Sequence, residues 1–150
     1  MVLLIAAAIL LADQLSKAWM SANLAGGQTI KALPGLLDLH LVHNSGAAFS
    51  LFSGSTLMLG LLSLIVGGGI LIWILRQRRI LFWQGMAVAF LLGGTLGNGL
   101  DRWRLGHVVD FLALVPIDFP IFNVADIAIN LAVVCFVIDL LTNRGGSRER

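Results

Sequence analysis

Residues 55–75 read STLMLGLLSLIVGGGILIWIL, a run of 21 residues with no charged side chain. A helix that crosses the hydrocarbon core of a bilayer needs about 20 mostly apolar residues, so this run predicts a membrane-spanning helix. Three other stretches of similar length and character predict spans over residues 2–20, 80–100 and 121–141. We therefore expect one integral-membrane domain over residues 1–150, built as an all-α bundle of four transmembrane helices.

The amino-acid composition also indicates a membrane protein. Apolar residues make up 58% of the chain and the mean hydropathy is +0.93, whereas soluble domains contain about 45–50% apolar residues. A soluble fold of this length has too little interior to bury so much apolar surface. The formal net charge of +2 is too small to indicate a nucleic-acid partner. The single cysteine, Cys135, excludes a disulfide within the chain.

The N-terminal run differs from a secretory signal peptide. It lacks the basic n-region of such peptides, and Asp13 and Lys17 lie where a cleavage site with small residues would be expected. We therefore expect residues 2–20 to be retained as the first helix of the bundle.

The distribution of basic residues predicts the orientation of the bundle. Arginines gather in the short turn between the second and third spans and after the fourth span, at Arg76, Arg78, Arg79, Arg144, Arg148 and Arg150. The two longer loops, residues 21–54 and 101–120, contain only three basic residues. Because short cytoplasmic loops carry the excess of Lys and Arg, both termini should be cytoplasmic and the long loops should face outward.

The first outward loop contains a predicted strand. Residues 37–43 read LDLHLVH, a largely alternating pattern that is typical of a half-buried strand, here on the membrane surface. Pro34-Gly35 before it indicates a turn. His40 and His43 are three residues apart and should point to opposite faces of the strand, so we do not expect them to share a metal ion.

Polar residues of the predicted bundle concentrate in its outward half. They are Asp13, Lys17, Asn98, Asp101, Arg102, Asn123 and Asp126, joined by Asn44 and Asp110 from the outer loops. An ionisable group in a membrane is costly and by default indicates a functional site. The segregation predicts a site that opens toward the outer leaflet.

Several of these residues also have purely structural interpretations. Asp13 and Lys17 are four residues apart in one predicted helix, so we expect an ion pair that neutralises two buried charges. Asp101 is followed directly by Arg102, and an interfacial ion pair between these neighbours would need no further role.

Asp110 and Asp126 are candidates for a catalytic pair, although Asp110 also fits an ordinary loop carboxylate. Asn123 and Asp126 equally have the spacing of a helix N-cap with an acid in the first turn, so spacing alone leaves the pairing open. A serine nucleophile lacks a histidine within the spans, and Cys135 lacks a positive neighbour that would favour its thiolate. His107 lies in a loop, and no HExxH-like metal motif occurs. Two adjacent carboxylates share one proton, so one can activate water while the other polarises a peptide carbonyl.

At these residues the sequence resembles the bacterial lipoprotein signal peptidases, or signal peptidase II, over nearly its whole length. Five motifs in the family's order make the resemblance highly specific: DQLSK at 13–17, NSGAAFS at 44–50, GGTLGN with DR at 93–102, VVDF at 108–111 and FNVAD at 122–126. One departure is that the first span begins almost at Met1, without the basic leader that many members have.

The resemblance implies that Asp110 and Asp126 are the catalytic pair. It implies that further residues bind the substrate or support the active site, namely Asn44, Gly46, Asn98, Asp101, Arg102, Asn123 and Ala125. Asp13 and Lys17 match family positions that support the fold, in agreement with their spacing.

The resemblance also implies a substrate and a setting. The substrate is a prolipoprotein whose lipobox cysteine carries diacylglycerol, cleaved just before that cysteine, and the family's inhibitor is the cyclic peptide globomycin. A small β-sheet covers the outer face of the bundle in the bacterial inner membrane, among membrane lipids. We expect Gly46-Ala47-Ala48 and Gly93-Gly94 to let the substrate backbone approach closely. No metal, cofactor or nucleic acid is implied, and a monomer is the simplest state.

Two other classes of function are compatible with the outer polar cluster. A small transporter or channel would need a polar path through the inner half of the bundle, for which the second and fourth spans offer little. A structural membrane protein would use the charges only to fix helix packing. Replacement of Asp110 distinguishes these classes, because only a peptidase would lose cleavage while inserting normally.

Overall fold

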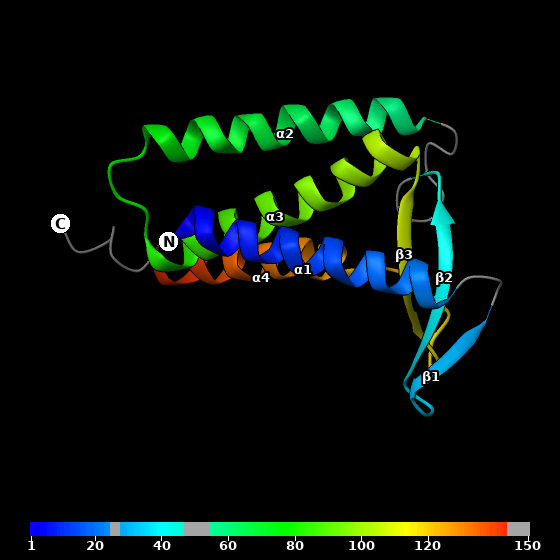
Figure 1. The fold of residues 1–150 in the computed structure, drawn as a ribbon. Helices are drawn as coiled ribbons and strands as arrows, with labels where there is room; N and C mark the ends of the chain where they lie inside the picture. The colour runs from blue at the N-terminus through cyan, green and yellow to red at the C-terminus, as the bar shows by residue number, and fades with distance from the viewer. Residues whose placement is uncertain (25–27, 47–54, 144–150) are drawn as a thin grey trace.

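The computed structural model describes residues 1–24, 28–46 and 55–143 of the 150-residue chain. Figure 1 shows a bundle of helices with a small sheet across one end. The helices of this described part are α1 (Val2–Asn23), α2 (Thr56–Arg76), α3 (Phe82–Leu105) and α4 (Val124–Asn143), and its strands are β1 (Thr29–Leu33), β2 (Leu37–Asn44) and β3 (Val108–Leu114). The predicted four-helix architecture with a sheet on one end is confirmed.

The helix α3 lies in the middle of the bundle. It packs against α1, α2 and α4, and Figure 1 shows α2 on one side of it with α1 and α4 on the other. Within the described residues, α1, α2 and α4 are long and apolar enough to cross a membrane. At 24 residues α3 is also long, but it is less apolar. Other helices enclose α3, so it needs little of the apolar outer surface that faces lipid.

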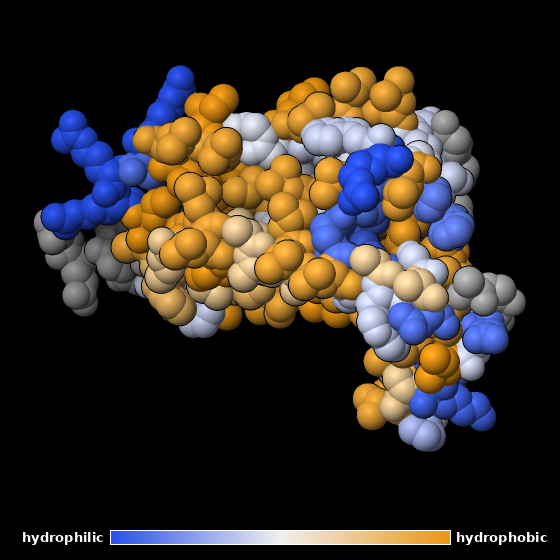
Figure 2. Space-filling view, in the orientation of Figure 1, coloured by the Kyte–Doolittle hydropathy of each residue, from blue (hydrophilic) through white to orange (hydrophobic). Residues whose placement is uncertain are grey.

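The outer surface of the bundle is apolar. Figure 2 shows hydrophobic residues over most of the visible face of the helices, and the exposed side chains include Leu57, Ile65, Leu75 and Val133. Monomeric soluble proteins rarely expose apolar surface on this scale, so the surface fits the predicted membrane protein.

Two glycines let α3 approach its neighbours. A Cβ atom at Gly93 would lie 2.8 Å from the carbonyl oxygen of Ala6 in α1, and one at Gly94 would lie 2.6 Å from that of Ala125 in α4. We expected Gly93-Gly94 to admit a substrate backbone, but that expectation is wrong, because both positions are buried in helix contacts. Close packing of helix backbones is the usual reason for small residues in membrane bundles.

The sheet is antiparallel, in the order β1-β2-β3. The predicted strand over residues 37–43 is confirmed as β2, which extends to Asn44. In the register with β3, Val42 pairs with Asp110 and Asn44 pairs with Val108. Because side chains alternate along a strand, Asn44 and Asp110 lie on the same face of the sheet.

The position of Asp110 differs from the prediction, which assigned residues 101–120 to a loop. Asp110 lies within β3, whose first four residues are all buried. A strand that is buried on both faces lacks the alternation of polar and apolar residues that identified β2, so the pattern gave no sign of it.

A small apolar core fastens the sheet to the outer end of α1. Met20, Leu24 and Phe111 are buried together, and Leu39 and Val124 pack against them. Since Phe111 directly follows Asp110 and Val124 opens α4, this core holds the middle of β3 beside the first turn of α4.

Candidate active site

Asp126 enters the site from the first turn of α4. Before this helix, Phe122 N donates to Leu112 O at 3.1 Å and Leu112 N donates to Phe122 O at 2.8 Å. This pairing keeps the chain extended, so α4 begins at Val124, three residues later than predicted. Asn123 Oδ1 accepts a hydrogen bond from Asp126 N at 3.0 Å, and Asp126 Oδ2 accepts one from Asn123 N at 3.1 Å. The predicted N-cap is confirmed in the form of a reciprocal capping box.

Two asparagines, Asn123 and Asn98, connect Asp110 with Asp126, and a third, Asn44, binds Asp110. Asn44 Nδ2 donates to Asp110 Oδ2 at 2.9 Å, and Asn123 Nδ2 donates to Asp110 Oδ1 at 2.6 Å. Asn98 Nδ2 donates to Asp126 Oδ1 at 2.8 Å, and Asn98 Oδ1 accepts from Asn123 Nδ2 at 3.0 Å. The two carboxyl groups therefore belong to one continuous hydrogen-bond network built from β2, β3, α3 and α4.

Burial tunes the acidity of Asp110, which is only 2% exposed. The pKa of its carboxyl group is raised to about 6, chiefly because the group is buried. The hydrogen bond from Asn44 lowers the pKa, the charge of Asp126 raises it, and the hydrogen bond from Asn123 lowers it. The group therefore changes between its acid and base forms close to neutral pH, which suits proton transfer in hydrolysis.

A cavity of about 530 Å³ opens beside the two aspartates. Asn44, Asn98, Arg102, Asp110 and Asp126 form its polar end. The segment 119–122 and one face of α4 form most of its apolar wall, with Ile127, Leu131 and Val134 on that helix. From Asp126 to Val134 this wall runs about 12 Å along α4. The cavity can therefore hold a polar chain at one end and an apolar segment along the helix.

Asp13 and Lys17 form the predicted ion pair, with Nζ 2.8 Å from Oδ2. Lys17 also lies 2.9 Å from Asp101 Oδ2 and donates to Asn98 Oδ1 at 2.9 Å. The structural interpretation of Asp101, in which it pairs with its neighbour Arg102, is therefore wrong. Successive residues in a helix point about 100° apart, so Asp101 faces α1.

Arg102 turns toward Gly46, two residues beyond the end of β2. Its guanidinium group donates to Gly46 O and to Asn98 O, both at 3.3 Å. Gly46 N in turn donates to Asn44 Oδ1 at 2.9 Å, so Gly46 fastens two cavity residues to each other. Ala47 and Ala48, also predicted to face the substrate, lie outside the described residues.

Two polar residues of the site were missed in the sequence. Gln14 Nε2 donates to Asp101 Oδ1 at 3.0 Å, to Gly97 O at 3.2 Å and to Asp13 Oδ2 at 3.2 Å. Asn130 lines the cavity one helical turn beyond Asp126, whose carbonyl oxygen it binds at 2.9 Å. Their polarity within apolar spans, and the four-residue spacing of Asn130 from Asp126, were the available signals.

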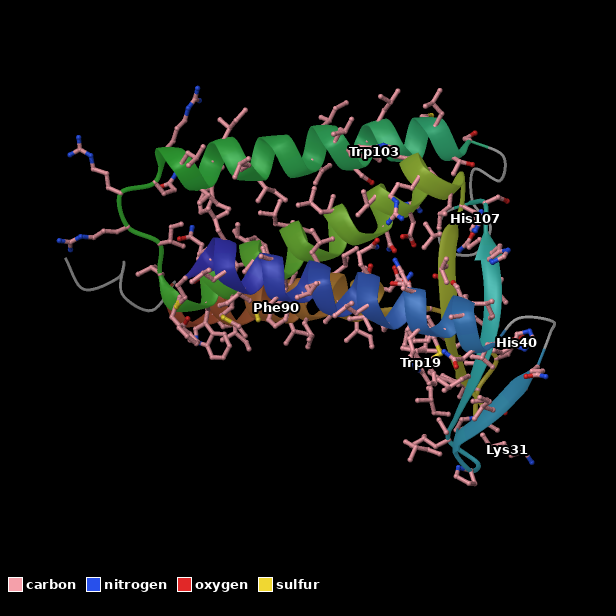
Figure 3. All side chains as sticks on the ribbon, viewed as in Figure 1. Trp19, Lys31, His40, Phe90, Trp103 and His107 are labelled. Atoms are coloured by element: carbon pink, nitrogen blue, oxygen red, sulfur yellow. The ribbon has the colours of Figure 1, made fainter. Side chains whose placement is uncertain are left out.

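The described histidines lie outside the cavity lining. His43 and His107 contact each other with ring centroids 4.3 Å apart, and His40 Nδ1 lies 3.0 Å from Thr29 Oγ1. Figure 3 shows His40 well separated from His107 along the sheet. Burial lowers the pKa of His107, and the neighbouring His43 lowers it further. The described part of the chain holds no group of three or more side chains suited to a metal ion.

Comparison with known families gives one match over most of the chain. Residues 5–142 match the model of the family described as signal peptidase (SPase) II. A lipoprotein signal peptidase of Parasynechococcus marenigrum is 64% identical over 145 residues, which cover 97% of this chain and 91% of that protein. A second, from a Synechococcus species, is 55% identical over 144 residues and covers 95% of both chains.

Two solved structures of bacterial membrane enzymes have the same fold. One superimposes with a TM-score of 0.90 at 28% identity, over 99% of this chain and 92% of that chain. The other has a TM-score of 0.83 at 29% identity, over 93% and 92% of the two chains.

Proposed function

The chain belongs to the signal peptidase II family, and we propose that Asp110 and Asp126 are its catalytic pair. Its activity is that of an aspartic endopeptidase that removes the signal peptide from diacylglyceryl-modified prolipoproteins, just before the lipidated cysteine. This membership sets aside the transporter and structural interpretations. The observation that supports the pair most directly is that both carboxyl groups line one cavity and are joined through asparagines.

Peptide hydrolysis by this pair requires one proton on two carboxyl groups. The ionised carboxylate takes a proton from water while the water oxygen attacks the carbonyl carbon, and the protonated carboxyl group gives its proton to the carbonyl oxygen. In the second step the C–N bond breaks, the first carboxyl group protonates the leaving nitrogen, and the second recovers a proton from a hydroxyl group. The pair then holds one proton again, and this proton belongs to the pair as a unit.

The cavity supports this substrate class. A signal peptide remains in the membrane as an apolar segment, which the apolar wall of α4 between Ile127 and Val134 would accommodate. The scissile bond would lie at the polar end, where Asn44, Asn98 and Arg102 can donate hydrogen bonds to backbone carbonyl groups. The other residues that the resemblance implies support this end by hydrogen bonds. Gly46 binds Arg102, Asp101 binds the backbone before Asp110, Asn123 binds Asp110, and Ala125 binds Asp13.

The protein is a multi-pass membrane protein, and we propose that its sheet and active site face the periplasm of a bacterial inner membrane. Arg76, Arg78 and Arg79 are exposed, and Figure 2 shows hydrophilic side chains at the end of the bundle away from the sheet. Because basic residues are retained on the cytoplasmic side of the membrane, this end of the bundle would be cytoplasmic, and both termini with it. A monomer among membrane lipids, without nucleic acid or cofactor, suffices because one chain supplies the whole proposed site.

The test is cleavage of a diacylglyceryl-modified prolipoprotein by purified protein in detergent, followed by a gel shift. Wild type is compared with Asp110→Asn, Asp126→Asn and the control Asp139→Asn, with and without EDTA. We expect both site variants to lose cleavage while remaining folded, and we expect EDTA and the control change to have no effect. Near-normal cleavage by either site variant would refute the pair, and loss of activity in EDTA would indicate a metal site instead.

A further inference from the structure

Two buried carboxyl groups outside the proposed pair bind the backbone directly before each of its members. Asp101 Oδ2 accepts a hydrogen bond from Val109 N at 3.1 Å, and Val109 precedes Asp110. Asp13 Oδ1 accepts one from Ala125 N at 2.9 Å, and Ala125 precedes Asp126. The two contacts are equivalent, although they come from different helices and act on a strand in one case and a helix in the other.

Two side chains of α1 join these carboxyl groups to each other. Lys17 Nζ lies 2.8 Å from Asp13 Oδ2 and 2.9 Å from Asp101 Oδ2. Gln14 Nε2 donates to Asp13 Oδ2 at 3.2 Å and to Asp101 Oδ1 at 3.0 Å. Val109, Asp101, Lys17, Gln14, Asp13 and Ala125 thus form one continuous chain of polar contacts behind the cavity.

We propose that Asp13 and Asp101 are positioning residues which, joined by Lys17 and Gln14, set the distance between the carboxyl groups of Asp110 and Asp126. The inference rests on the proposed function of that pair. In each case a buried carboxylate holds the backbone N–H of the residue that directly precedes a member of the pair. A change in either contact would therefore shift the corresponding catalytic side chain relative to the other.

The charges argue for more than helix packing. Neutralising buried Lys17 requires only one carboxylate, and Asp13 supplies it from the same helix. The second carboxylate, Asp101, adds a negative charge in a buried site, where unpaired charge is costly. Asp101 uses its other contacts on Gln14 and on the backbone before Asp110, and a role in holding that backbone accounts for its presence.

The distance between two carboxyl groups controls how they share a proton. Close carboxylates repel each other, which pushes their two macroscopic pKa values apart and widens the pH range in which one proton is held. If the contact of Asp13 or Asp101 with the backbone is lost, the two carboxyl groups of the pair should move apart. The catalytic rate should then fall and the bell-shaped pH profile should narrow. A purely structural role would lower the amount of folded enzyme without moving either limb of the profile.

The variants Asp13→Ala and Asp101→Ala remove the acceptors, whereas Asp13→Asn and Asp101→Asn keep an oxygen for the backbone N–H. The Asn variants also leave Lys17 with one carboxylate, so a neutral pair remains. We expect the Ala variants to lose ~10–100-fold in kcat with KM changed by less than about threefold, as a misplacement near 1 Å would produce. The Asn variants should recover much of kcat, and the pH profile of the Ala variants should narrow.

Gln14→Leu provides a second test if the Ala variants do not fold, because it removes one of the two links between the carboxyl groups, leaving only Lys17, without changing charge. A wild-type kcat and a wild-type pH width in folded Gln14→Leu would overturn the proposal, as would wild-type values in Asp101→Ala. Loss of cleavage in Asp110→Asn and Asp126→Asn would leave the catalytic pair standing in either case. If those two variants cleave normally, the proposed function itself fails.

Discussion

α2 and α3 pack against each other in one bundle, but their surfaces differ in almost every respect. α2 has no charged residue before its last position, Arg76, and most of its apolar side chains are exposed. α3 buries Thr95, Asn98 and Asp101 among glycines and contacts all three other helices. High hydropathy therefore marks a helix that is exposed to lipid, whereas polar residues of the site lie on a helix that the rest of the protein encloses.

The largest expected difference is between substitutions of a glycine in α3 and a glycine in α2. In α3, a Cβ atom at Gly94 would meet the backbone oxygen of Ala125 at 2.6 Å, whereas one at Gly68 in α2 would meet nothing within 4 Å. We expect Gly94→Ala to destabilise the fold by about 3 kcal/mol through overpacking and to abolish most activity. Gly68→Ala should be neutral or stabilising by up to ~1 kcal/mol, since alanine favours helices. Thermal unfolding in detergent measures the stability of both variants, and cleavage of prolipoprotein measures their activity. Equal losses in the two variants would contradict the difference in packing between α3 and α2.

A smaller difference is expected between substitutions of a polar side chain in α3 and one in α2. Asn98 contacts Lys17, Asn123 and Asp126, whereas Ser63 in α2 donates to Leu59 O of its own helix at 3.0 Å. We expect Asn98→Ala to lower kcat by ~100-fold, the size of effect seen when one polar group of an active site is removed. Ser63→Ala should stay within about twofold of wild type. A comparable loss in both variants, measured as kcat and KM, would show that α2 takes part in the site.

The parts of the fold that follow from the sequence are those with local signals. The uncharged run 55–75 predicts α2 without reference to the rest of the chain, and the four-residue spacing of Asp13 and Lys17 predicts their ion pair. The spacing of Asn123 and Asp126 likewise predicts the helix cap. Each of these rests on a periodicity or a contact within a single element.

The parts that do not follow depend on contacts between distant segments. The start of α4 is delayed because Phe122 pairs with Leu112 across the turn after β3. Asp101 contacts Lys17 in another helix instead of the adjacent Arg102, and no spacing within α3 signals this. The importance of Asp110 came from the family motif, because buried β3 shows no alternation.

The last effect concerns the stability that the fold loses by burying the carboxyl group of Asp110, a kind of group that α2 lacks. The folded pKa of Asp110 is raised to about 6, above its value of about 3.9 in an unfolded chain. A raised carboxyl pKa favours the folded state fully below pH ~4, and this contribution is lost as pH rises through ~6. Asp110→Asn removes the titrating group, so the variant should exceed wild type in unfolding free energy at pH 8 by up to ~3 kcal/mol.

At pH 4 this difference should disappear, because wild-type Asp110 is then protonated and neutral like the asparagine. Thermal unfolding in detergent at the two pH values measures it, with the exposed loop residue Asp118 changed to Asn as the control. A difference that does not vary with pH would mean that packing, and not the charge of Asp110, determines the effect. A pH-dependent gain in stability together with loss of cleavage would show that the buried carboxyl group is kept for catalysis at the expense of stability.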